Sequence, residues 1–299
     1  MDYNVNQINP RYDFIVSGAS YKGNPKCNTA MFITKKVERL LGNLSGVQEC
    51  LVFAEDGIIV PSALEVNNCF VMTQSPQLDY ARFANELAQI RTDRDKALRY
   101  QLTEQGYYLS ETAQVGENAY IEPGRIIGHD VILGKNATIL AGTVIKNAVS
   151  GDNFLANEKA VIGAKGFTMA EDESGNKMRI ATLGKVLIGN RVEVGALDNI
   201  SCGSGGDTVL EDNVKVDALV HIGHDVHLGK DTEITAGSII GGFVETGLHA
   251  YIGINACIRN RIQLGEGCVV GMGSTVTKTV EAGVTVAGNP ARRFEKKDK

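Results

Sequence analysis

Residues 210–280 read LEDNVKVDALVHIGHDVHLGKDTEITAGSIIGGFVETGLHAYIGINACIRNRIQLGEGCVVGMGSTVTKTV and contain a regular six-residue repeat. In successive sixes from Leu210, an aliphatic residue opens eleven of the twelve hexads, and Thr246 is the exception. The aliphatic openers are Leu210, Val216, Ile222, Leu228, Ile234, Ile240, Ile252, Ile258, Leu264, Val270 and Val276. A period of six is neither the 3.6 of a helix nor the 2 of an isolated strand, and short hexapeptide repeats are typical of a parallel β-helix. We therefore predict a mainly β chain in which three hexads make one triangular coil and residues 18 apart stack.

The composition excludes several classes of protein. The 299 residues include 34 glycines and no tryptophan, which suits narrow coils with tight corners. A net charge of −5 argues against a nucleic-acid groove, and no run of about 18 apolar residues is present, so we expect no nucleic-acid partner and no membrane insertion. The six cysteines are scattered without a CxxC pair, and the N-terminus lacks a signal pattern. These features predict a reduced, cytoplasmic protein.

Three regions follow from where the six-residue repeat runs. Residues 1–110 lack it and carry short β-branched and aromatic runs, followed by a Ser75-Pro76 pair that predicts a helix start. We predict a small α/β domain over 1–110, the β-helix over 111–281 and a C-terminal extension over 282–299. The β-branched and aromatic runs are Phe14–Val16, Met31–Ile33, Cys50–Phe53 and Cys69–Met72.

Two excursions interrupt the repeat. Lys165–Lys185 is polar and turn-rich, and an excursion this long from a regular coil is usually functional or disordered. Cys202–Asp207 is shorter and contains Gly205-Gly206, which could suggest a phosphate-binding loop. No GK[ST] follows it and no strand–loop–helix unit surrounds it, so we favour a flexible loop at a coil corner.

Histidines cluster in the segment HIGHDVHLG, residues 221–229. Zinc needs ligands about 2 Å from one point, but the six-residue frame places His221, His224 and His227 on successive sides or corners of the coil. We therefore predict no metal site. His129 and His249, like His221 and His227, are given no direct role.

His224 is the candidate catalytic residue. With a coil length of 18 it stacks with Gly242 and Asn260, and a glycine there leaves an open notch beside the imidazole. Asp225 can accept a hydrogen bond from one ring nitrogen, which leaves the other as a base, the usual role of histidine near neutral pH. Composition alone is equally compatible with His224 as a surface residue on a polar corner.

The front half of the chain resembles the UDP-3-O-acylglucosamine N-acyltransferases of lipid A synthesis, one branch of the hexapeptide-repeat acyltransferases. The segment SPQLDYAR at residues 75–82 is close to that family's NPYLxYAR, GAKGF at 163–167 is close to GADGFG, and 217–224 is close to DNxxQIAH. The resemblance implies a left-handed parallel β-helix, an N-terminal domain that holds uridine, and His224 as the base. The stretch that matches the family's INGH motif is Ile258–Arg261, which lacks the histidine.

The back half is similar to the sialic-acid O-acetyltransferase and bacillosamine N-acetyltransferase group. IGHD at 222–225, IGINAC at 252–257 and GNPAR at 288–292 carry this likeness. It implies a homotrimer with acetyl-CoA between subunits, a general-base histidine at His224 and an acidic residue, Asp225, that orients its ring. The GNPAR ending favours CoA, because a nearby arginine can hold its phosphates.

Together these features predict an acyltransferase of cell-surface polysaccharide synthesis that acylates the amine of a nucleotide-linked amino sugar. Acetyl-CoA or another acyl-CoA is the expected donor, His224 and Asp225 are the catalytic pair, and no metal is required. The expected donor-binding residues are Gly242, Ile254, Gly271 and Arg292. Three alternatives stay open: a sugar O-acetyltransferase, an N-acyltransferase that uses acyl carrier protein, and a sugar-binding β-helix scaffold without turnover.

Overall fold

The computed structural model describes residues 3–294, and the chain forms two compact units. The N-terminal unit contains residues up to 97 together with 167–184 and 204–206. The β-helix unit contains 98–166, 185–203 and the residues from 207 onward. The two are described separately below.

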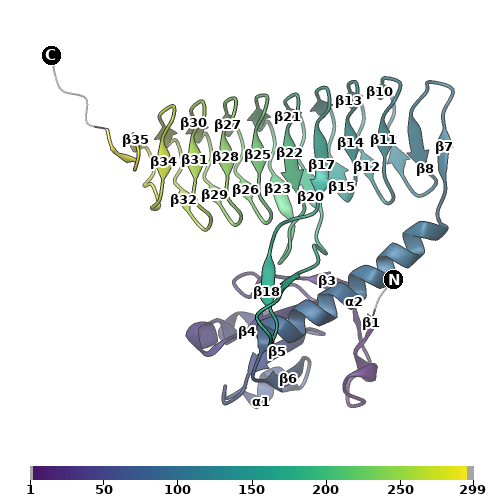
Figure 1. The fold of residues 1–299 in the computed structure, drawn as a ribbon, viewed down its shortest axis with the longest axis vertical. Coiled ribbons are helices and arrows are strands. Elements are labelled where there is room, and N and C mark those ends of the chain that lie inside the picture. The colour runs from purple at the N-terminus through teal and green to yellow at the C-terminus, as the bar shows by residue number, and fades with distance from the viewer. Residues whose placement is uncertain (1–2, 295–299) are drawn as a thin grey trace. The chain divides into compact units, whose positions relative to one another are not determined.

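The β-helix unit is a coil of short strands that form three faces, two of ten strands and one of eight (Figure 1). Strands pair in parallel along each face, except for antiparallel pairs at the two ends. These are β7 (Tyr100–Leu102) with β8 (Tyr108–Ser110) and β35 (Thr285–Ala287) with β36 (Arg292–Arg293). Residues 18 apart stack as predicted: Ile222 pairs with Ile240, and Ile240 with Ile258.

The first face consists of β10 (Tyr120–Ile121), β13 (Thr138–Ile139), β16 (Leu155–Ala156), β21 (Glu193–Val194), β24 (Lys215–Val216), β27 (Glu233–Ile234), β30 (Tyr251–Ile252), β33 (Val269–Val270), β35 (Thr285–Ala287) and β36 (Arg292–Arg293). The second consists of β7 (Tyr100–Leu102), β8 (Tyr108–Ser110), β11 (Ile126–Ile127), β14 (Val144–Ile145), β17 (Val161–Ala164), β22 (Asn199–Ser201), β25 (His221–Ile222), β28 (Ile239–Ile240), β31 (Cys257–Ile258) and β34 (Thr275–Val276). The third consists of β9 (Gln114–Val115), β12 (Ile132–Leu133), β15 (Ala148–Ser150), β20 (Val186–Ile188), β23 (Thr208–Leu210), β26 (His227–Leu228), β29 (Glu245–Thr246) and β32 (Gln263–Leu264).

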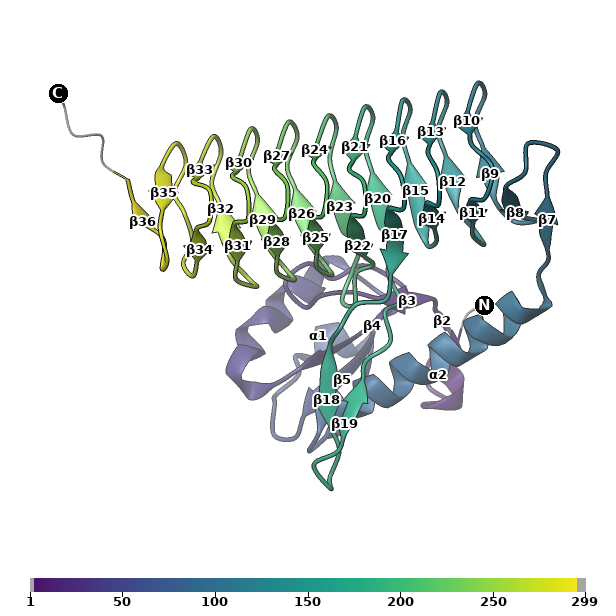
Figure 2. The same ribbon diagram turned by 45° about the horizontal axis from the view of Figure 1, so that its top comes forward.

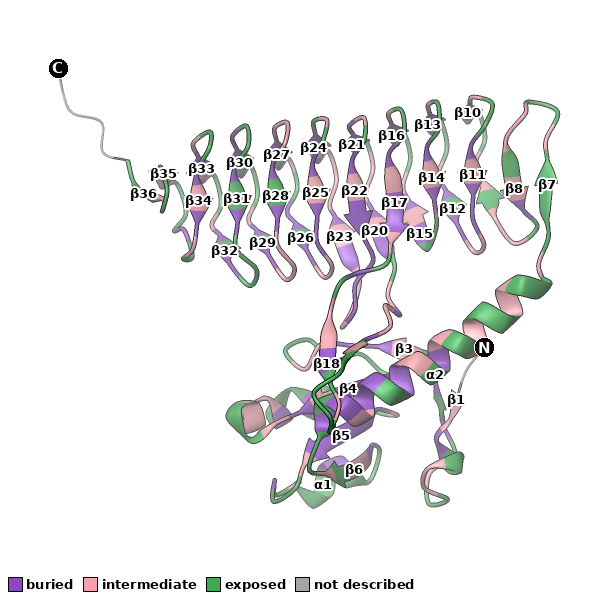
Figure 3. Ribbon diagram, in the orientation of Figure 1, coloured by how far each residue is buried: buried purple, intermediate pink, exposed green. Residues whose placement is uncertain are grey.

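The hexad openers fill the interior of this coil, and all twelve from Leu210 to Val276 are buried (Figure 3). Thr246 is buried as well, because its hydroxyl has partners inside. Its Oγ1 accepts the Gly229 N–H at 2.8 Å and lies 2.9 Å from Oγ1 of Thr232. A buried hydroxyl that is hydrogen-bonded in this way costs little, so one polar opener fits an otherwise aliphatic interior.

Changes in coil length explain where the repeat becomes irregular. Thr138 pairs with Leu155, so this coil has one residue fewer than 18 and the hexad pattern blurs after Ser150. Leu155 then pairs with Glu193 and Glu193 with Lys215, because the two excursions lengthen these coils. The core nevertheless continues without a break through these coils.

The N-terminal unit is built on a parallel four-stranded sheet of β3 (Gly18–Ala19), β4 (Thr29–Ile33), β5 (Leu51–Glu55) and β6 (Cys69–Thr73), on which α2 (Pro76–Ala97) packs (Figure 2). The helix begins at Pro76, as the Ser75-Pro76 pair predicts. The other elements are β1 (Tyr3–Asn4), β2 (Ile15–Val16), α1 (Ser62–Glu65) and 3-10 segments at Val5–Gln7 and Lys35–Gly46.

Both excursions of the β-helix contribute to the N-terminal unit. The longer one forms an antiparallel hairpin, β18 (Met169–Glu171) with β19 (Lys177–Arg179). Its Ala170, Ile180 and Leu183 are buried in the core of that unit. The shorter one contains Ser204, which is also buried and whose carbonyl accepts a hydrogen bond from the Tyr80 hydroxyl at 3.2 Å.

Among residues 3–294, no helix has both the length and the apolar character to cross a bilayer. The end of the C-terminal extension, residues 295–299 with the basic Lys296 and Lys297, lies outside the described residues.

Candidate active site

The candidate base lies on a corner of the coil between the second and third faces. His224 and Asp225 follow β25 there, and Asp225 adopts a left-handed backbone conformation with φ of 58°. Aspartate and asparagine tolerate this conformation better than most residues, so the sequence suits the turn. The Asp225 N–H donates to Oγ1 of the buried Thr208 at 3.0 Å, which ties the corner to the preceding coil.

His224 and Asp225 form a hydrogen-bonded pair. The imidazole Nδ1 lies 2.7 Å from Asp225 Oδ2, and the side chains are 17% and 6% exposed. Because a carboxylate only accepts hydrogen bonds, Nδ1 carries the proton of this bond, and Nε2 is the other nitrogen of the ring. The pair therefore has the geometry of an oriented general base.

Gly242 keeps the position over Nε2 open. A Cβ atom placed on Gly242 would lie 2.8 Å from His224 Nε2 and 2.9 Å from Cε1. Among residues 3–294, the Gly242 N–H donates to no acceptor. The corner thus holds a base and a backbone donor close together, with no side chain from Gly242 between them.

A second motif, distant in sequence, meets His224 from the other side. A Cβ on Gly166 would lie 3.0 Å from His224 Cβ and 3.5 Å from the carbonyl oxygen of Cys202. Gly166 therefore allows the GAKGF segment to approach the base closely. Burial raises the pKa of the neighbouring Cys202 thiol to about 12, so this cysteine is no thiolate nucleophile at neutral pH.

The neighbouring histidines have partners of their own. His227 Nε2 lies 2.7 Å from Glu211 Oε1, and His249 Nδ1 lies 3.8 Å from Asp231 Oδ2. Burial, with a smaller contribution from nearby His224, lowers the pKa of His221. Within the described part of the chain, no three metal-ligating side chains gather at one point.

The expected donor-binding residues fall into two groups. Gly242 shares the corner of His224, whereas Ile254 and Gly271 follow β30 and β33 at the corner between the first and second faces. One chain therefore does not bring Ile254 and Gly271 to the His224 corner. Ile254 is 46% exposed on its own corner.

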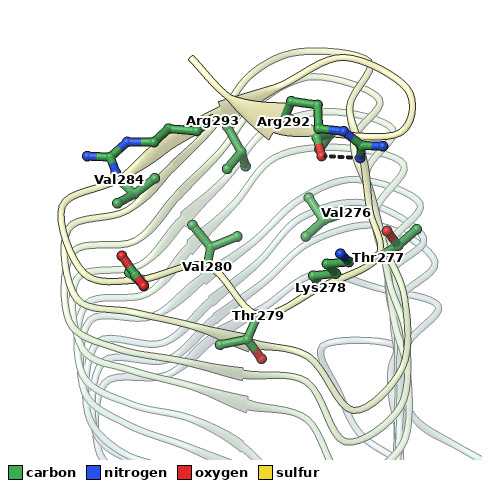
Figure 4. Close-up of a pocket in the computed structure, with 11 residues that line it drawn as sticks. Val276, Thr277, Lys278, Thr279, Val280, Val284, Arg292 and Arg293 are labelled. Atoms are coloured by element: carbon green, nitrogen blue, oxygen red, sulfur yellow. Dashed lines mark hydrogen bonds between the residues drawn. The ribbon is translucent and has the colours of Figure 1, made fainter. Parts of the chain in front are cut away.

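Arg292 lines a pocket of about 350 Å³ where the coil ends (Figure 4). Figure 4 shows Val276 and Val280 toward its middle and the side chains of Arg292 and Arg293 extending to opposite sides. Lys278 also lines it, so three cations accompany one carboxylate, that of Glu281. Sequence reasoning missed Lys278, although the 18-residue register places it three coils beyond His224 on the same corner.

Comparisons with known proteins agree with the repeat and the fold. The family model for the bacterial transferase hexapeptide (six repeats) matches residues 112–147 and 207–242, and the second match contains His224, Asp225 and Gly242. UDP-N-acetylglucosamine acyltransferase from Campylobacter jejuni is 23% identical, with a TM-score of 0.57 over 65% of this chain and 74% of that one. The enzyme of the same name from Francisella novicida is also 23% identical, with a TM-score of 0.57 over 64% of this chain and 68% of that one. At this identity the likeness shows the fold alone.

The repeats, the three-faced coil and these neighbours show that the chain has the fold of a left-handed parallel β-helix built of hexapeptide repeats. In sequence, the chain is similar to proteins named UDP-3-O-acylglucosamine N-acyltransferase. That of Hydrogenovibrio crunogenus is 38% identical over 120 residues, which are 40% of this chain and 34% of that protein. That of Coxiella burnetii is 33% identical over 203 residues, with 59% of each covered. The chain thus spans less than two thirds of the length of these relatives.

Proposed function

We propose that this protein is an acyltransferase that transfers an acyl group from a thioester to the amine of a nucleotide-linked amino sugar, with His224 as the general base. The observation that carries the proposal is the 2.7 Å bond between His224 Nδ1 and Asp225, which leaves Nε2 facing the open position at Gly242. The similarity to N-acyltransferases of a UDP-linked acylglucosamine supports the acceptor class.

The reaction follows from this geometry. The sugar amine attacks the thioester carbonyl carbon, and Nε2 takes a proton from the nitrogen as the N–C bond forms. The tetrahedral intermediate then collapses, the C–S bond breaks, and the proton passes from Nε2 to the leaving sulfur. Asp225 holds the ring in the tautomer that has a basic Nε2 and stabilises the imidazolium between the two transfers.

Gly242 has two roles in this proposal. Its missing side chain makes room for the tetrahedral centre beside Nε2, and its N–H, which has no acceptor among residues 3–294, donates to the developing oxyanion. Backbone donors aimed at a developing charge are among the strongest contributions to acyl transfer. No metal is needed in this scheme.

We propose acetyl-CoA, or another acyl-CoA, as the donor. The phosphates of CoA would bind Arg292 in the terminal pocket, where Arg293 and Lys278 add positive charge. Lys278 supports this placement because it lies on the His224 corner. Acyl carrier protein is the alternative donor.

Ile254 and Gly271 lie on another corner of the coil, so we propose that a neighbouring subunit of a cytoplasmic homotrimer supplies them to the donor groove. The predicted 1–110 domain would bind the nucleotide.

The test is an acyl-transfer assay of the full chain with UDP- and dTDP-linked amino sugars and their hydroxyl analogues. The donors are acetyl-CoA, longer acyl-CoAs and an acyl carrier protein thioester. We expect N-acylation by the wild type and a loss of about a hundred- to ten-thousandfold in His224→Ala. His227→Ala is the matched control, because it removes a half-exposed histidine of the same coil.

Three other results of this assay would change the proposed function. Undiminished transfer by His224→Ala would show that another group is the base. Transfer to hydroxyl sugars alone would make the protein an O-acyltransferase. Sugar binding without turnover by any donor would make it a binding scaffold.

A further inference from the structure

Phe243, which follows Gly242 at the His224 corner, has an unusual backbone conformation for an aromatic residue. Its φ is 59°, in the left-handed region. Asparagine and aspartate fill many of the equivalent turns of this coil, as at Asn213, Asp225 and Asn255. Bulky side chains adopt this conformation less readily than asparagine or aspartate, and such strain is concentrated at functional sites. The conformation of Phe243 therefore suggests that the contacts of its ring have a function.

The Phe243 ring contacts both the candidate base and a cation. It meets the His224 imidazole edge-on, with centroids 5.2 Å apart and planes at 89°. The guanidinium carbon of Arg261 lies 4.2 Å from the centroid of the same ring. Phe243 thus fixes one side of the imidazole and holds Arg261 close to it.

The backbone fixes Arg261 at this place. Asp225, Phe243 and Arg261 are 18 residues apart and have φ of 58°, 59° and 62° at the same turn of successive coils. The Arg261 N–H donates to the Gly242 carbonyl at 3.0 Å, which links the cation to the residue that faces Nε2. Arg261 is exposed at the surface of the described chain.

An arginine stacked on an aromatic ring is well suited to bind a phosphoryl group. Stacking engages the face of the guanidinium, whereas recognition of phosphate uses its N–H edge, so one residue can do both. Stacking also limits the rotamers of a flexible side chain, which lowers the entropy lost when a ligand binds. In a chain with a net charge of −5, a cation beside the candidate base favours an anionic substrate at that corner.

We propose that Arg261, held on the Phe243 ring, binds a phosphoryl group of a substrate next to His224. The proposal rests on the proposed function, because both the nucleotide-linked sugar and the acyl-CoA carry phosphoryl groups. Phe243 is a positioning residue: it holds the cation and the imidazole at a fixed separation. Arg261 sets which substrates reach the base.

The first experiment compares kcat/KM of the wild type, Arg261→Gln and Arg261→Lys. Arg259→Gln is the matched control, because Arg259 is an exposed arginine two residues away without a ring contact among the described residues. Arg261→Gln should lose about ten- to a hundredfold, the usual range for a hydrogen bond to a charged group. Arg261→Lys should recover part of it, and Arg259→Gln should stay near the wild type.

Truncated substrates identify the source of the phosphoryl group. If the acceptor supplies it, the loss in Arg261→Gln disappears with an amino sugar that has no nucleotide. If the donor supplies it, the loss disappears with an N-acetylcysteamine thioester in place of acyl-CoA. A loss that persists with both truncated substrates, or no loss with intact ones, would overturn the proposal, since Arg261 would then act only by packing on Phe243.

Direct binding of inorganic pyrophosphate separates this proposal from the proposed function. Titration calorimetry should show weaker binding to Arg261→Gln than to the wild type and to Arg259→Gln, whether or not acyl transfer is found. Phe243→Leu, which keeps an apolar side chain but removes the ring, should weaken pyrophosphate binding in the same direction. Equal binding by the wild type and Arg261→Gln would contradict the assignment even in an active enzyme.

Discussion

Two columns of residues run along the β-helix with the same 18-residue spacing and opposite character. The interior column at Ile222 continues with isoleucine at 240 and 258, all at most 1% exposed. The corner column two residues further on contains His224, Gly242 and Asn260. Interior side chains pack against their neighbours above and below at near-crystalline density, which keeps their chemistry uniform. Corner side chains have fewer such constraints, so chemistry can vary there without loss of the coil.

Ile240→Ala, in the interior column, should have the largest effect, a loss of stability that substitutions in the corner column do not cause. Ile240 is fully buried in β28 and pairs with isoleucine on both sides, so the substitution leaves a cavity. We expect the free energy of unfolding to fall by about 2–5 kcal/mol, measured by urea denaturation.

The adjacent residue is the matched control for that experiment. Ile239 is 43% exposed in the same strand, and Ile239→Ala should change the free energy of unfolding by less than about 1 kcal/mol. Similar losses from both substitutions would mean that the outer side chain is packed as tightly as the inner one, for example in an assembly.

Gly242→Ala tests the corner column. The added methyl would lie 2.8 Å from His224 Nε2, so it displaces the imidazole or fills the space of the tetrahedral centre. We expect a loss of about a hundredfold in kcat, since a misplacement of 1 Å can cost that much. Steady-state kinetics with saturating donor measures it.

The stability of the same variant completes the comparison. Gly242 has no left-handed backbone conformation, so alanine should leave the urea midpoint close to that of the wild type. Gly42→Ala, at a glycine with no heavy atom within 4 Å of the added Cβ, should change neither stability nor rate. Full activity in Gly242→Ala would remove this residue from the proposed site.

The fold was predictable because every coil places the same kind of side chain, an aliphatic one, at the same interior positions. Each coil needs an aliphatic residue at fixed positions, so period six could be read from eleven openers without knowledge of any contact. The hydrogen bond between His224 and Asp225 was predictable for a related reason, since neighbours in sequence at one turn are neighbours in space. The 18-residue register likewise placed Gly242 beside the imidazole.

Other parts of the structure depend on contacts that cannot be inferred from the six-residue repeat. The Lys165–Lys185 excursion forms a hairpin, and Ile180 and Leu183, which follow the hairpin, join the core of the N-terminal unit. Gly166 follows β17 at the start of that excursion and meets His224 from two strands away along the second face, a contact that the 18-residue register does not contain. Phe243 was missed because its role depends on a ring orientation, which residue spacing does not determine.

Asp198 is a polar residue in the interior of the coil. Apart from the control substitutions, the effect expected of it is the smallest of those predicted. Its carboxylate is 1% exposed and accepts the N–H groups of Gly195 and Val220, each at 2.8 Å. Burial raises its pKa to about 7, against the two hydrogen bonds, and the charge of Asp217 raises it further. The folded state therefore holds a proton between pH 4 and 7 that the unfolded state, with an ordinary carboxyl pKa near 3.9, has lost.

Because the folded state binds the additional proton, stability contributed by Asp198 is present at low pH and is lost as the pH rises toward 7. The free energy of unfolding should fall by about 2 kcal/mol between pH 5 and pH 7 from this group, and Asp198→Asn should remove that part of the slope. Urea midpoints of both proteins at several pH values in this range give the difference. If the free energy of unfolding of both proteins changed equally with pH, Asp198 would already be ionised in the folded state at pH 5. The two backbone N–H donors would then be sufficient to stabilise a charge in the interior of this coil.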